Sequence, residues 1–509
     1  MLHFSTPLEA AHWLKQRSAG SLQSDSRQLQ AGDAFVAWPG GVSDARQYVA
    51  SAVVQGAAAC LVERDGVESF DWKSDAVATY DGLKPAAGLI ATEFFQNPSQ
   101  SLAVVAITGT NGKTSSAWWL AQALSALPDG LALPCGLVGT LGVGCPPAAG
   151  QASSAAEGVG LVETGFTTPD PVMLQRTLRQ FADAGLKACA MEASSIGIEE
   201  HRLNGTQIQV AVFTNFTQDH LDYHGDMQSY WDSKRKLFSW PGLQHAVINV
   251  DDPQGAALAS ALQAQGQNVW TTSVLTDAKI RAQSIGYTEQ GLRFEVCEDG
   301  VSHAVTTQMI GTYNVSNLLG VIAAMRCLGL PLKRAVAVCA DLRPVPGRME
   351  CLTLPGAPLV AVDYAHTPDA IGKALDALRS LASQRGGKLW CVFGCGGDRD
   401  NAKRPMMGAL AAQKADRVVV TSDNPRSEKP EAIIAQVLLG IAKSVDVLVQ
   451  ADRALAIAQT LAQADAKDVV LLAGKGHETT QEVLGVKTAF SDRTYAQVAM
   501  QLRAQGAAV

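Results

Sequence analysis

The sequence predicts an α/β protein of three domains, and three observations lead to this prediction. At 509 residues the chain is too long for a single hydrophobic core and suggests about three domains of ordinary size. Its composition is globular, with 47% hydrophobic and 17% charged residues. From about residue 340, strand-like and helix-like segments alternate, which is typical of a mainly parallel sheet covered by helices on both faces.

Residues 1–98 are predicted to form a small N-terminal α/β domain. A helix is expected over 7–16, and strands are expected over 33–38 and 57–63. The segment QNPSQ, residues 96–100, is rich in turn residues and is predicted to be the linker to the next domain.

A central domain is predicted over residues 99–339, of the P-loop type and with a mainly parallel sheet. It opens with an apolar strand over 101–108, a glycine-rich loop and a helix over 115–127. Further buried strands are expected over 186–194, 209–216 and 245–252, and a helix over 314–329.

Residues 340–509 are predicted to form a Rossmann-like C-terminal domain. Strands are expected over 358–366, 388–397, 417–424, 445–450 and 468–476, and helices over 368–382, 404–415, 429–443 and 453–464. Four of these strands end in polar sequences, namely DYAH, GCGGDRD, SDNPR and GKGHE. Because ligands of parallel sheets bind at the carboxyl ends of the strands, these sequences predict a binding site there.

The overall composition excludes several classes of protein. A net charge of −7 and a pI near 5.8 argue against a general nucleic-acid binder, which carries a basic face. No stretch reaches the roughly 18 apolar residues of a membrane span, and the first residues resemble no signal peptide. The ten cysteines form no C-x-x-C pair, which indicates thiols in a reducing compartment. We therefore expect a cytoplasmic protein.

The sequence TGTNGKT, residues 108–114, predicts a phosphate-binding loop. A glycine-rich turn between a buried strand and a helix presents backbone N–H groups and a helix N-terminus to an anion. Lys113 would neutralise phosphate oxygens and Thr114 would bind Mg²⁺. The loop is shorter than the common G-x-x-x-x-G-K-[ST] pattern, because Ile107 stands where that pattern has its first glycine. The alternative is a tight strand–helix turn with a surface lysine.

Two further stretches carry polar residues after strands. Glu192 ends an apolar strand, where a carboxylate is costly unless it is paired or bound to a metal, and Mg²⁺ prefers such oxygen ligands. The cluster of acidic and histidine residues at 219–226 is either a polar loop with capping aspartates or a metal site. Lys234, taken alone, is a surface lysine.

Taken together, these motifs resemble the Mur ligases of peptidoglycan synthesis over nearly the whole chain. TGTNGKT matches the short phosphate loop of that family. The resemblance implies ATP and Mg²⁺ as cofactors, with Mg²⁺ held by Thr114, Glu192, His220 and Lys234. It also implies that Lys234 is carbamylated, because a carbamate offers Mg²⁺ anionic oxygen where an ammonium would repel it. The implied ATP contacts are Gly109, Thr110, Asn111, Gly112, Lys113, Thr114, Ser115, Asn314, Asn317, Arg348 and Asp363.

The resemblance also implies that the first domain binds the UDP end of a UDP-N-acetylmuramoyl dipeptide. The matching contacts are Ser24, Ser26, Thr167, Thr168, Ser194, Glu200 and Arg202. Three positions depart from the pattern common in the family. Phe166 stands where asparagine is frequent, Ile196 replaces a histidine and Glu200 replaces a glutamine. These departures concern single contacts and leave the implied substrate class unchanged.

The sequence DNPR, residues 423–426, resembles the signature of family members that add meso-diaminopimelate. Without that resemblance, Asn-Pro predicts a turn in which Asp423 caps the next helix. Arg426 suits the distal carboxylate of diaminopimelate, because a guanidinium binds a carboxylate with two parallel hydrogen bonds. Lysine lacks that carboxylate and would be rejected. The implied contacts are Arg399, Asp423, Asn424, Pro425, Arg426, Gly474 and Glu478, the last for the distal ammonium.

The implied activity is an ATP-dependent ligase. It adds meso-2,6-diaminopimelate to the γ-carboxylate of D-glutamate in UDP-N-acetylmuramoyl-L-alanyl-D-glutamate through an acyl phosphate, in a chain expected to be a monomer. A lysine-adding relative, MurF and folylpolyglutamate synthase are alternatives within the class. DNPR argues against the first, and the N-terminal SDSR with the chain length argues against the last. A P-loop nucleotide switch is the alternative from another class.

Overall fold

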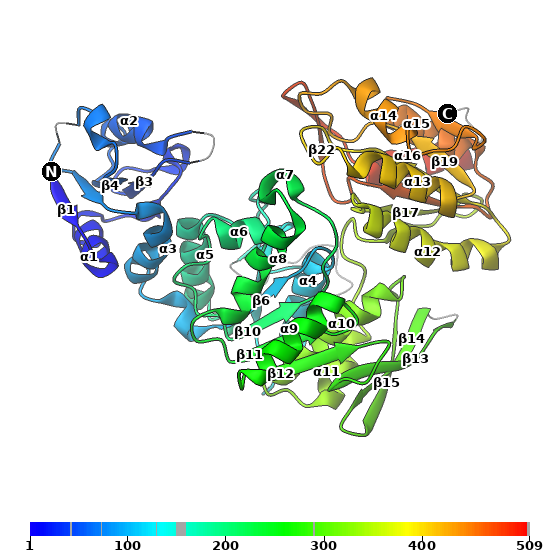
Figure 1. The fold of residues 1–509 in the computed structure, drawn as a ribbon, viewed down its shortest axis with the longest axis horizontal. Coiled ribbons are helices and arrows are strands. Elements are labelled where there is room, and N and C mark those ends of the chain that lie inside the picture. The colour runs from blue at the N-terminus through cyan, green and yellow to red at the C-terminus, as the bar shows by residue number, and fades with distance from the viewer. Residues whose placement is uncertain (41–42, 73, 129, 149–158, 289–290, 506–509) are drawn as a thin grey trace.

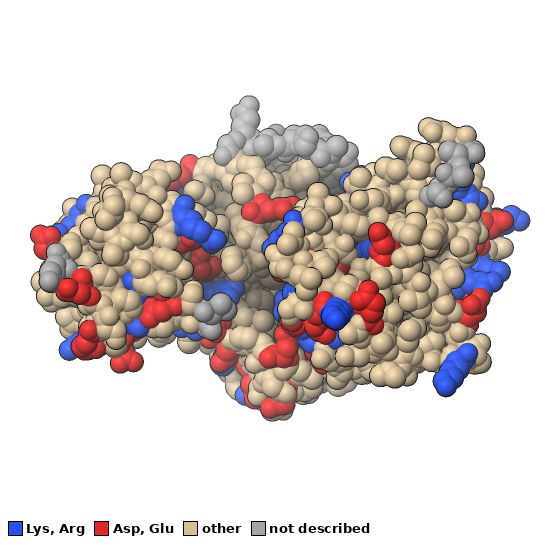
Figure 2. Space-filling view, turned by 90° about the horizontal axis from the view of Figure 1, so that it is seen from above, with Lys and Arg blue, Asp and Glu red and all other residues tan. Residues whose placement is uncertain are grey.

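The computed structural model describes residues 1–40, 43–72, 74–128, 130–148, 159–288 and 291–505, and it confirms the predicted α/β class. Three sheets follow one another along the chain, and the first and third lie as separate lobes on either side of the second (Figure 1). On the face seen in Figure 2, Lys and Arg are interspersed with Asp and Glu, and the surface is hollowed between the lobes. None of the described helices is both long enough and apolar enough to cross a membrane.

The first sheet has five parallel strands in the order β1-β5-β4-β3-β2. The predicted strands over 33–38 and 57–63 are β3 and β4. Helix α1 begins where expected, because Thr6 accepts a hydrogen bond from the Glu9 backbone and Pro7 occupies the first turn. The elements are β1 (Leu2–Phe4), α1 (Pro7–Arg17), β2 (Leu22–Gln23), β3 (Ala34–Ala37), α2 (Val49–Val54), β4 (Ala59–Glu63), β5 (Val77–Tyr80) and α3 (Leu83–Phe94).

The second sheet has ten strands in the order β15-β14-β13-β12-β11-β10-β6-β9-β7-β8. It is parallel from β13 through to β7, and β14, β15 and β8 are antiparallel additions at its two edges. The strands are β6 (Ala103–Thr108), β7 (Cys135–Gly139), β8 (Gly142–Gly144), β9 (Ala188–Glu192), β10 (Val210–Phe213), β11 (His245–Asn249), β12 (Val269–Ser273), β13 (Ile280–Thr288), β14 (Gly291–Glu298) and β15 (Val301–Thr307).

Helices cover both faces of this sheet and form two hydrophobic cores. Side chains of α4, α10 and α11 fill the core on one face, and those of α5, α8 and α9 fill the core on the other. Being buried on both sides, the inner strands are continuously apolar, and this made them recognisable in the sequence. The helices are α4 (Lys113–Ser125), α5 (Pro171–Asp183), α6 (Ser195–Glu199), α7 (Leu221–His224), α8 (Met227–Arg235), α9 (Pro253–Ala264), α10 (Tyr313–Cys327) and α11 (Leu332–Cys339).

The third sheet has six strands in the order β16-β17-β21-β18-β19-β20, all parallel except β16. A separate hairpin, β22–β23, follows β21. The strands are β16 (Glu350–Leu352), β17 (Leu359–Asp363), β18 (Leu389–Phe393), β19 (Arg417–Val420), β20 (Val447–Val449), β21 (Val469–Ala473), β22 (Thr480–Val483) and β23 (Val486–Ala489). The helices are α12 (Pro368–Arg385), α13 (Lys403–Lys414), α14 (Pro430–Leu438), α15 (Arg453–Gln463) and α16 (Asp492–Ala504).

Two connections join the sheets. The chain passes from the first sheet to the second through a 3-10 helix, Pro98–Ser101, and from the second to the third between α11 and β16. The domain boundaries at 98/99 and 339/340 remain predictions. Other 3-10 helices are Ser26–Gln28, Ala45–Tyr48, Val67–Ser69 and Lys236–Ser239.

Candidate active site

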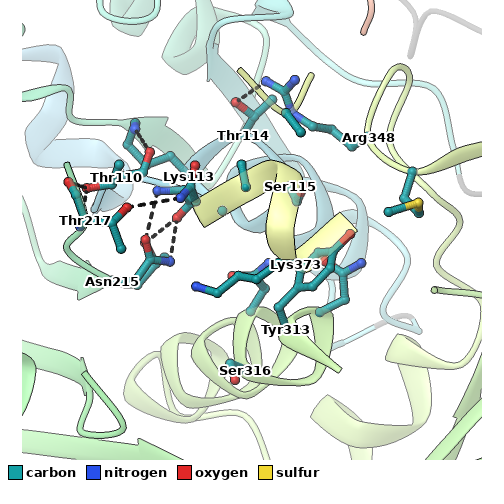
Figure 3. Close-up of a pocket in the computed structure, with 18 of the residues that line it drawn as sticks. Thr110, Lys113, Thr114, Ser115, Asn215, Thr217, Tyr313, Ser316, Arg348 and Lys373 are labelled. Atoms are coloured by element: carbon teal, nitrogen blue, oxygen red, sulfur yellow. Dashed lines mark hydrogen bonds between the residues drawn. The ribbon is translucent and has the colours of Figure 1, made fainter. Parts of the chain in front are cut away.

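A cavity of about 760 Å³ lies where the second and third sheets meet. The loop between β6 and α4 forms one wall, α10 forms another, and residues after β17 with α12 close it from the C-terminal side. In Figure 3, Thr110, Lys113 and Asn215 lie on one side of the cavity and Tyr313 and Lys373 on another, with Arg348 beside Thr114. The structure therefore places the predicted ATP residues, except Gly109, at the wall of one cavity.

The glycines of the loop are required by its close contacts. Gly109 and Gly112 have φ values of 145° and 87°, in the region that favours glycine. A Cβ atom on Gly109 would lie 1.9 Å from Thr214 Oγ1, and one on Gly112 would lie 2.4 Å from Asn317 Oδ1. The backbone N–H of Asn111 donates to Asn215 Oδ1 at 2.9 Å. Asn215 is thus a supporting residue that the sequence pattern did not single out.

A buried lysine, Lys234, and a partly buried one, Lys113, meet at one carbonyl oxygen. The Nζ atoms of Lys113 and Lys234 each donate to Gly109 O at 2.8 Å. Lys234 is 1% exposed, its ammonium lies over the Tyr230 ring, and no carboxylate of the described residues forms an ion pair with it. Burial and the neighbouring charge of Lys113 hold the pKa of Lys234 well below its usual value. Burial also lowers the pKa of Lys113.

Thr114, Glu192 and Arg348 form the second feature of the cavity. Thr114 Oγ1 donates to Glu192 Oε2 at 2.9 Å, and Arg348 Nη2 donates to Thr114 Oγ1 at 3.2 Å. The other Glu192 oxygen accepts from the Thr140 backbone N–H at 2.7 Å. Within the described part of the chain, Nη1 of Arg348 is buried without a hydrogen-bond partner. An unpaired buried guanidinium nitrogen is costly, and an anionic ligand would satisfy it.

The oxygen atoms beside the loop fit a magnesium ion. Among the described residues, no group of three or more His, Cys, Asp or Glu side chains is placed to hold a metal alone. Mg²⁺ usually binds through one or two carboxylates together with substrate phosphates and water. Glu192 and the Thr114 hydroxyl supply such ligands at the wall of the cavity.

His220 lies in a charged cluster between the second and third sheets. Its Nε2 is 3.5 Å from Asp219 Oδ2, and the same carboxylate lies 3.7 Å from His366 Nε2 and 3.7 Å from Lys403 Nζ. Burial lowers the pKa of His220 to about 3, so the imidazole is neutral at physiological pH, the form that binds metals. Asp219, His366 and Lys403 join segments far apart in the sequence, which the sequence analysis did not pair.

The remaining predicted ATP residues line the same cavity. Asn317 donates to Asn314 Oδ1 at 3.2 Å, and Asn314 donates to Ile310 O at 2.8 Å. Asp363, at the end of β17, accepts backbone N–H bonds from Met349 at 2.6 Å and Ala365 at 2.8 Å. Its carboxylate therefore also holds the chain that connects Arg348 to β16.

Four predicted dipeptide contacts lie near Glu192, namely Thr167, Thr168, Ser194 and Arg202. Thr168 Oγ1 lies 2.8 Å from Glu192 O and 3.0 Å from Ser194 Oγ, and Arg202 donates to Thr168 O at 2.9 Å. Thr167 and Thr140 share a hydroxyl–hydroxyl hydrogen bond of 3.0 Å.

The structure separates Glu200 and Ser24 from this group. Glu200 pairs with Lys84 at 2.7 Å and accepts from the Tyr223 hydroxyl at 2.7 Å, so both of its oxygens are engaged. Ser24 donates to Asp170 Oδ1 at 2.7 Å, at the junction of the first and second sheets, and Ser26 begins a 3-10 helix two residues later.

The other two positions that depart from the family pattern lie near the same segment. Phe166 is 50% exposed, with the Arg202 guanidinium over its ring, and Ile196 is half-buried in α6.

The predicted amino-acid residues gather at the carboxyl ends of β18, β19 and β21. Asn424 Nδ2 donates to Glu478 Oε2 at 2.8 Å, and a Cβ on Gly474 would lie 2.4 Å from Asp423 Oδ2. Lys475, which is fully buried, donates to the same Glu478 oxygen at 2.7 Å and to Asn424 Oδ1 at 3.1 Å. Lys475 had not been predicted, because a single lysine in a glycine-rich turn carries no distinguishing pattern.

Arg426 is held between two loops. Its Nη1 donates to Gly397 O at 2.8 Å, and a Cβ on Gly397 would lie 1.8 Å from Pro425 O. The glycines of GCGG therefore permit the loop after β18 to contact the loop after β19. Arg399 is on the same loop and donates to Asp398 O at 3.1 Å.

Comparisons with known proteins agree with this arrangement. The family described as "Mur ligase middle domain" matches residues 107–325, and "Mur ligase, glutamate ligase domain" matches residues 347–476. A curated relative from Acidovorax sp. (strain JS42), UDP-N-acetylmuramoyl-L-alanyl-D-glutamate--2,6-diaminopimelate ligase, is 58% identical over 99% of each chain. The enzyme of that name from Janthinobacterium sp. (strain Marseille) is 47% identical over 97% of each chain.

Solved structures show the same relationship. A structure of UDP-N-acetylmuramoyl-L-alanyl-D-glutamate--2,6-diaminopimelate ligase is 32% identical, with a TM-score of 0.62 over 95% of each chain. MurF from Acinetobacter baumannii, at 18% identity and a TM-score of 0.67, shares the fold over 97% of this chain and 98% of its own. Because relatives far above 30% identity span the whole chain, the protein belongs to the Mur ligase family.

Proposed function

We propose that the protein is an ATP-dependent ligase that adds meso-2,6-diaminopimelate to UDP-N-acetylmuramoyl-L-alanyl-D-glutamate. The observation that carries this proposal is the placement of two sites on one chain. The cavity at the phosphate loop contains an unpaired buried nitrogen of Arg348, and the loops that hold Arg426 and Glu478 lie at the strand ends of the third sheet. A nucleotide switch needs the first site and has no use for the second.

The reaction proposed for these sites has two steps. An oxygen of the D-glutamyl γ-carboxylate attacks the γ-phosphorus of ATP, ADP leaves, and an acyl phosphate forms. The amine of diaminopimelate, after losing a proton, then attacks the acyl carbon. The bond between the acyl carbon and the phosphate oxygen breaks, and phosphate leaves. Lys113 and Arg348 offset the charge of the transferring phosphoryl group. Thr114 and Glu192 would hold Mg²⁺, which would supply further positive charge at the phosphate oxygens.

The remaining residues are proposed to bind ATP and the UDP-dipeptide. Asn314, Asn317 and Asp363 are proposed to contact the nucleotide. Thr167, Thr168, Ser194 and Arg202 are proposed to contact the dipeptide. Ser24 and Ser26 are proposed to bind the UDP end. For Glu200, the ion pair with Lys84 supports a role in joining the first and second sheets in addition to any substrate contact.

We further propose that Lys234 reacts with CO₂ to form a carbamate. Two ammonium groups on a single carbonyl oxygen would repel each other, and burial together with the charge of Lys113 lowers the pKa of Lys234, which favours the neutral, nucleophilic amine. The carbamate would be an anion facing Lys113, so the repulsion would become attraction.

Lys234 is therefore expected to take up labelled CO₂. In ¹³C NMR with [¹³C]bicarbonate, the wild type should show a protein-bound carbamate signal, and the Lys234→Arg variant should not, because a guanidinium forms no carbamate. Lys236→Arg, two residues away on an exposed side chain, is the matched control and should keep the signal. A signal equally strong in Lys234→Arg would refute the modification.

Glu192→Gln is expected to weaken the response to magnesium. The amide keeps the shape of the side chain and removes the anionic oxygen, so the Mg²⁺ concentration for half-maximal activity should rise about ten- to a hundredfold. Titration of activity with Mg²⁺ measures this, and exposed Glu163→Gln serves as the control. An unchanged half-maximal concentration would place the ion elsewhere.

The activity is tested by phosphate release with ATP, Mg²⁺ and UDP-N-acetylmuramoyl-L-alanyl-D-glutamate, in parallel with meso-diaminopimelate, L-lysine and L-ornithine. Turnover with diaminopimelate alone is expected. Turnover with lysine as well would keep the ligase and overturn the selectivity given to Arg426. Hydrolysis independent of any acceptor would favour the nucleotide switch.

We also propose that the protein acts in the cytoplasm as a monomer. All ten cysteines are free thiols, which suits a reducing compartment.

A further inference from the structure

The β22–β23 hairpin is attached to the loop that contains Arg426. The hairpin is largely exposed, with Leu484 at 70% and Val486 at 63% exposure, so burial of its own side chains contributes little to holding it in place. Its two ends meet where Phe490 N donates to Thr479 O at 2.9 Å. Between those ends, Val483 forms an isolated parallel bridge with Arg426. The hairpin thus pairs through its backbone with the loop that contains Arg426.

The backbone of Arg426 depends on this pairing. Its φ of 52° lies in the left-handed region, which is unfavourable for a residue with a side chain and persists only where neighbouring groups hold it. The Arg426 N–H donates to Glu482 O at 3.1 Å, and the Arg426 carbonyl accepts from Leu484 N at 2.6 Å. Both partners belong to the hairpin, so the hairpin holds the strained residue on both sides.

Gln481 secures the residues that precede Arg426. Its Nε2 donates to Asp423 O at 2.7 Å and to Ser422 Oγ at 3.1 Å. The next residue, Glu482, donates its backbone N–H to Asn424 Oδ1 at 3.1 Å. The segment 481–484 therefore binds the segment 422–426. Gln481 contributes through its side chain, and the other hairpin residues contribute through their backbone.

We infer that Gln481 and the β22–β23 hairpin position Arg426 and thereby set the selectivity for an amino acid with a second carboxylate. The inference rests on the proposed function. A guanidinium binds a carboxylate with two hydrogen bonds only when its plane is correctly placed, and a displacement of about 1 Å loses much of that gain. Among the described residues, the Arg426 side chain forms one hydrogen bond, to Gly397 O, so its placement depends mainly on its backbone.

Gln481→Met tests the inference, because methionine has a similar length and no N–H donor. The KM for meso-diaminopimelate is expected to rise about tenfold, as for the loss of two hydrogen bonds, and the preference for diaminopimelate over lysine to fall by a similar factor. The KM values for ATP and the UDP-dipeptide should stay within about twofold of wild type, a split that general destabilisation would not produce. Lys487→Ala, exposed on the same hairpin, should behave as wild type.

A second variant replaces residues 480–489 by two glycines, which can connect the adjacent Thr479 and Phe490. It should show a larger loss of selectivity, with folding checked by circular dichroism. Acceptor-dependent turnover in the wild type, with unchanged diaminopimelate KM and selectivity in Gln481→Met, would overturn the inference alone. A wild type without acceptor-dependent turnover would overturn the proposed function as well.

Discussion

Replacement of Lys113 by methionine is expected to lower kcat for phosphate release by about a thousandfold, since a preorganised charge at the transferring group is lost. Within the described part of the chain, the hydrogen bonds of this side chain are to its own loop, at 2.8 Å to Gly109 O and 2.9 Å to Thr110 O. Loss of these bonds should leave the fold intact. Once ATP is bound, the same ammonium is free to turn to the phosphate oxygens.

Steady-state kinetics and a thermal melt together measure this effect. Lys443 is exposed, and Lys443→Met should retain wild-type turnover. This variant therefore controls for the loss of a lysine charge away from the cavity. A Lys113→Met enzyme that folds and turns over within tenfold of wild type would show that the loop does not bind the reacting phosphates.

Arg426→Met should abolish the selectivity for diaminopimelate. We expect kcat/KM for diaminopimelate to fall about a thousandfold, because its distal carboxylate would be buried without its two charge-assisted hydrogen bonds. The value for lysine should change little or rise, since lysine no longer leaves a guanidinium unpaired. Competition between the two amino acids, followed by mass spectrometry of the product, measures the ratio directly.

The control for this variant is Arg417→Met. Arg417 lies on β19, the strand that precedes the loop containing Arg426, and its replacement removes a surface ion pair with Asp446. Its selectivity should equal that of wild type. If the Arg426→Met enzyme still preferred diaminopimelate by the wild-type factor, the selectivity would have to come from another residue.

The fold class was predictable because buried parallel strands are continuous in apolar residues. β6, β9, β10 and β11 were located in this way, as were the five parallel strands of the C-terminal sheet. Several other strands were missed. β13 places exposed residues between buried or half-buried ones, and β22 and β23 are short and polar, so none of these three has an apolar run. The helix expected over 429–443 ends at Leu438, five residues early, with Gly440 shortly after it.

The motifs proposed for the site are visible in the sequence, but the contacts between them are not. TGTNGKT and DNPR are continuous in sequence, and their roles depend on local turns. The hydrogen bonds of Lys113 and Lys234 to one oxygen join residues 121 positions apart in numbering, and those of Gln481 join β22 to the loop after β19. The pairing of Glu200 with Lys84 likewise links two domains. Such contacts follow from the packing of sheets, which no local pattern specifies.

Transfer of ¹⁸O tests the central claim most directly. The substrate is UDP-N-acetylmuramoyl-L-alanyl-D-glutamate with both oxygens of the γ-carboxylate labelled, incubated with ATP, Mg²⁺ and meso-diaminopimelate. If the chain activates this carboxylate by phosphorylation, each released phosphate will contain one ¹⁸O atom, in step with formation of the tripeptide product. Released phosphate without ¹⁸O would mean that water attacks ATP, and the assignment as a ligase acting through an acyl phosphate would be wrong.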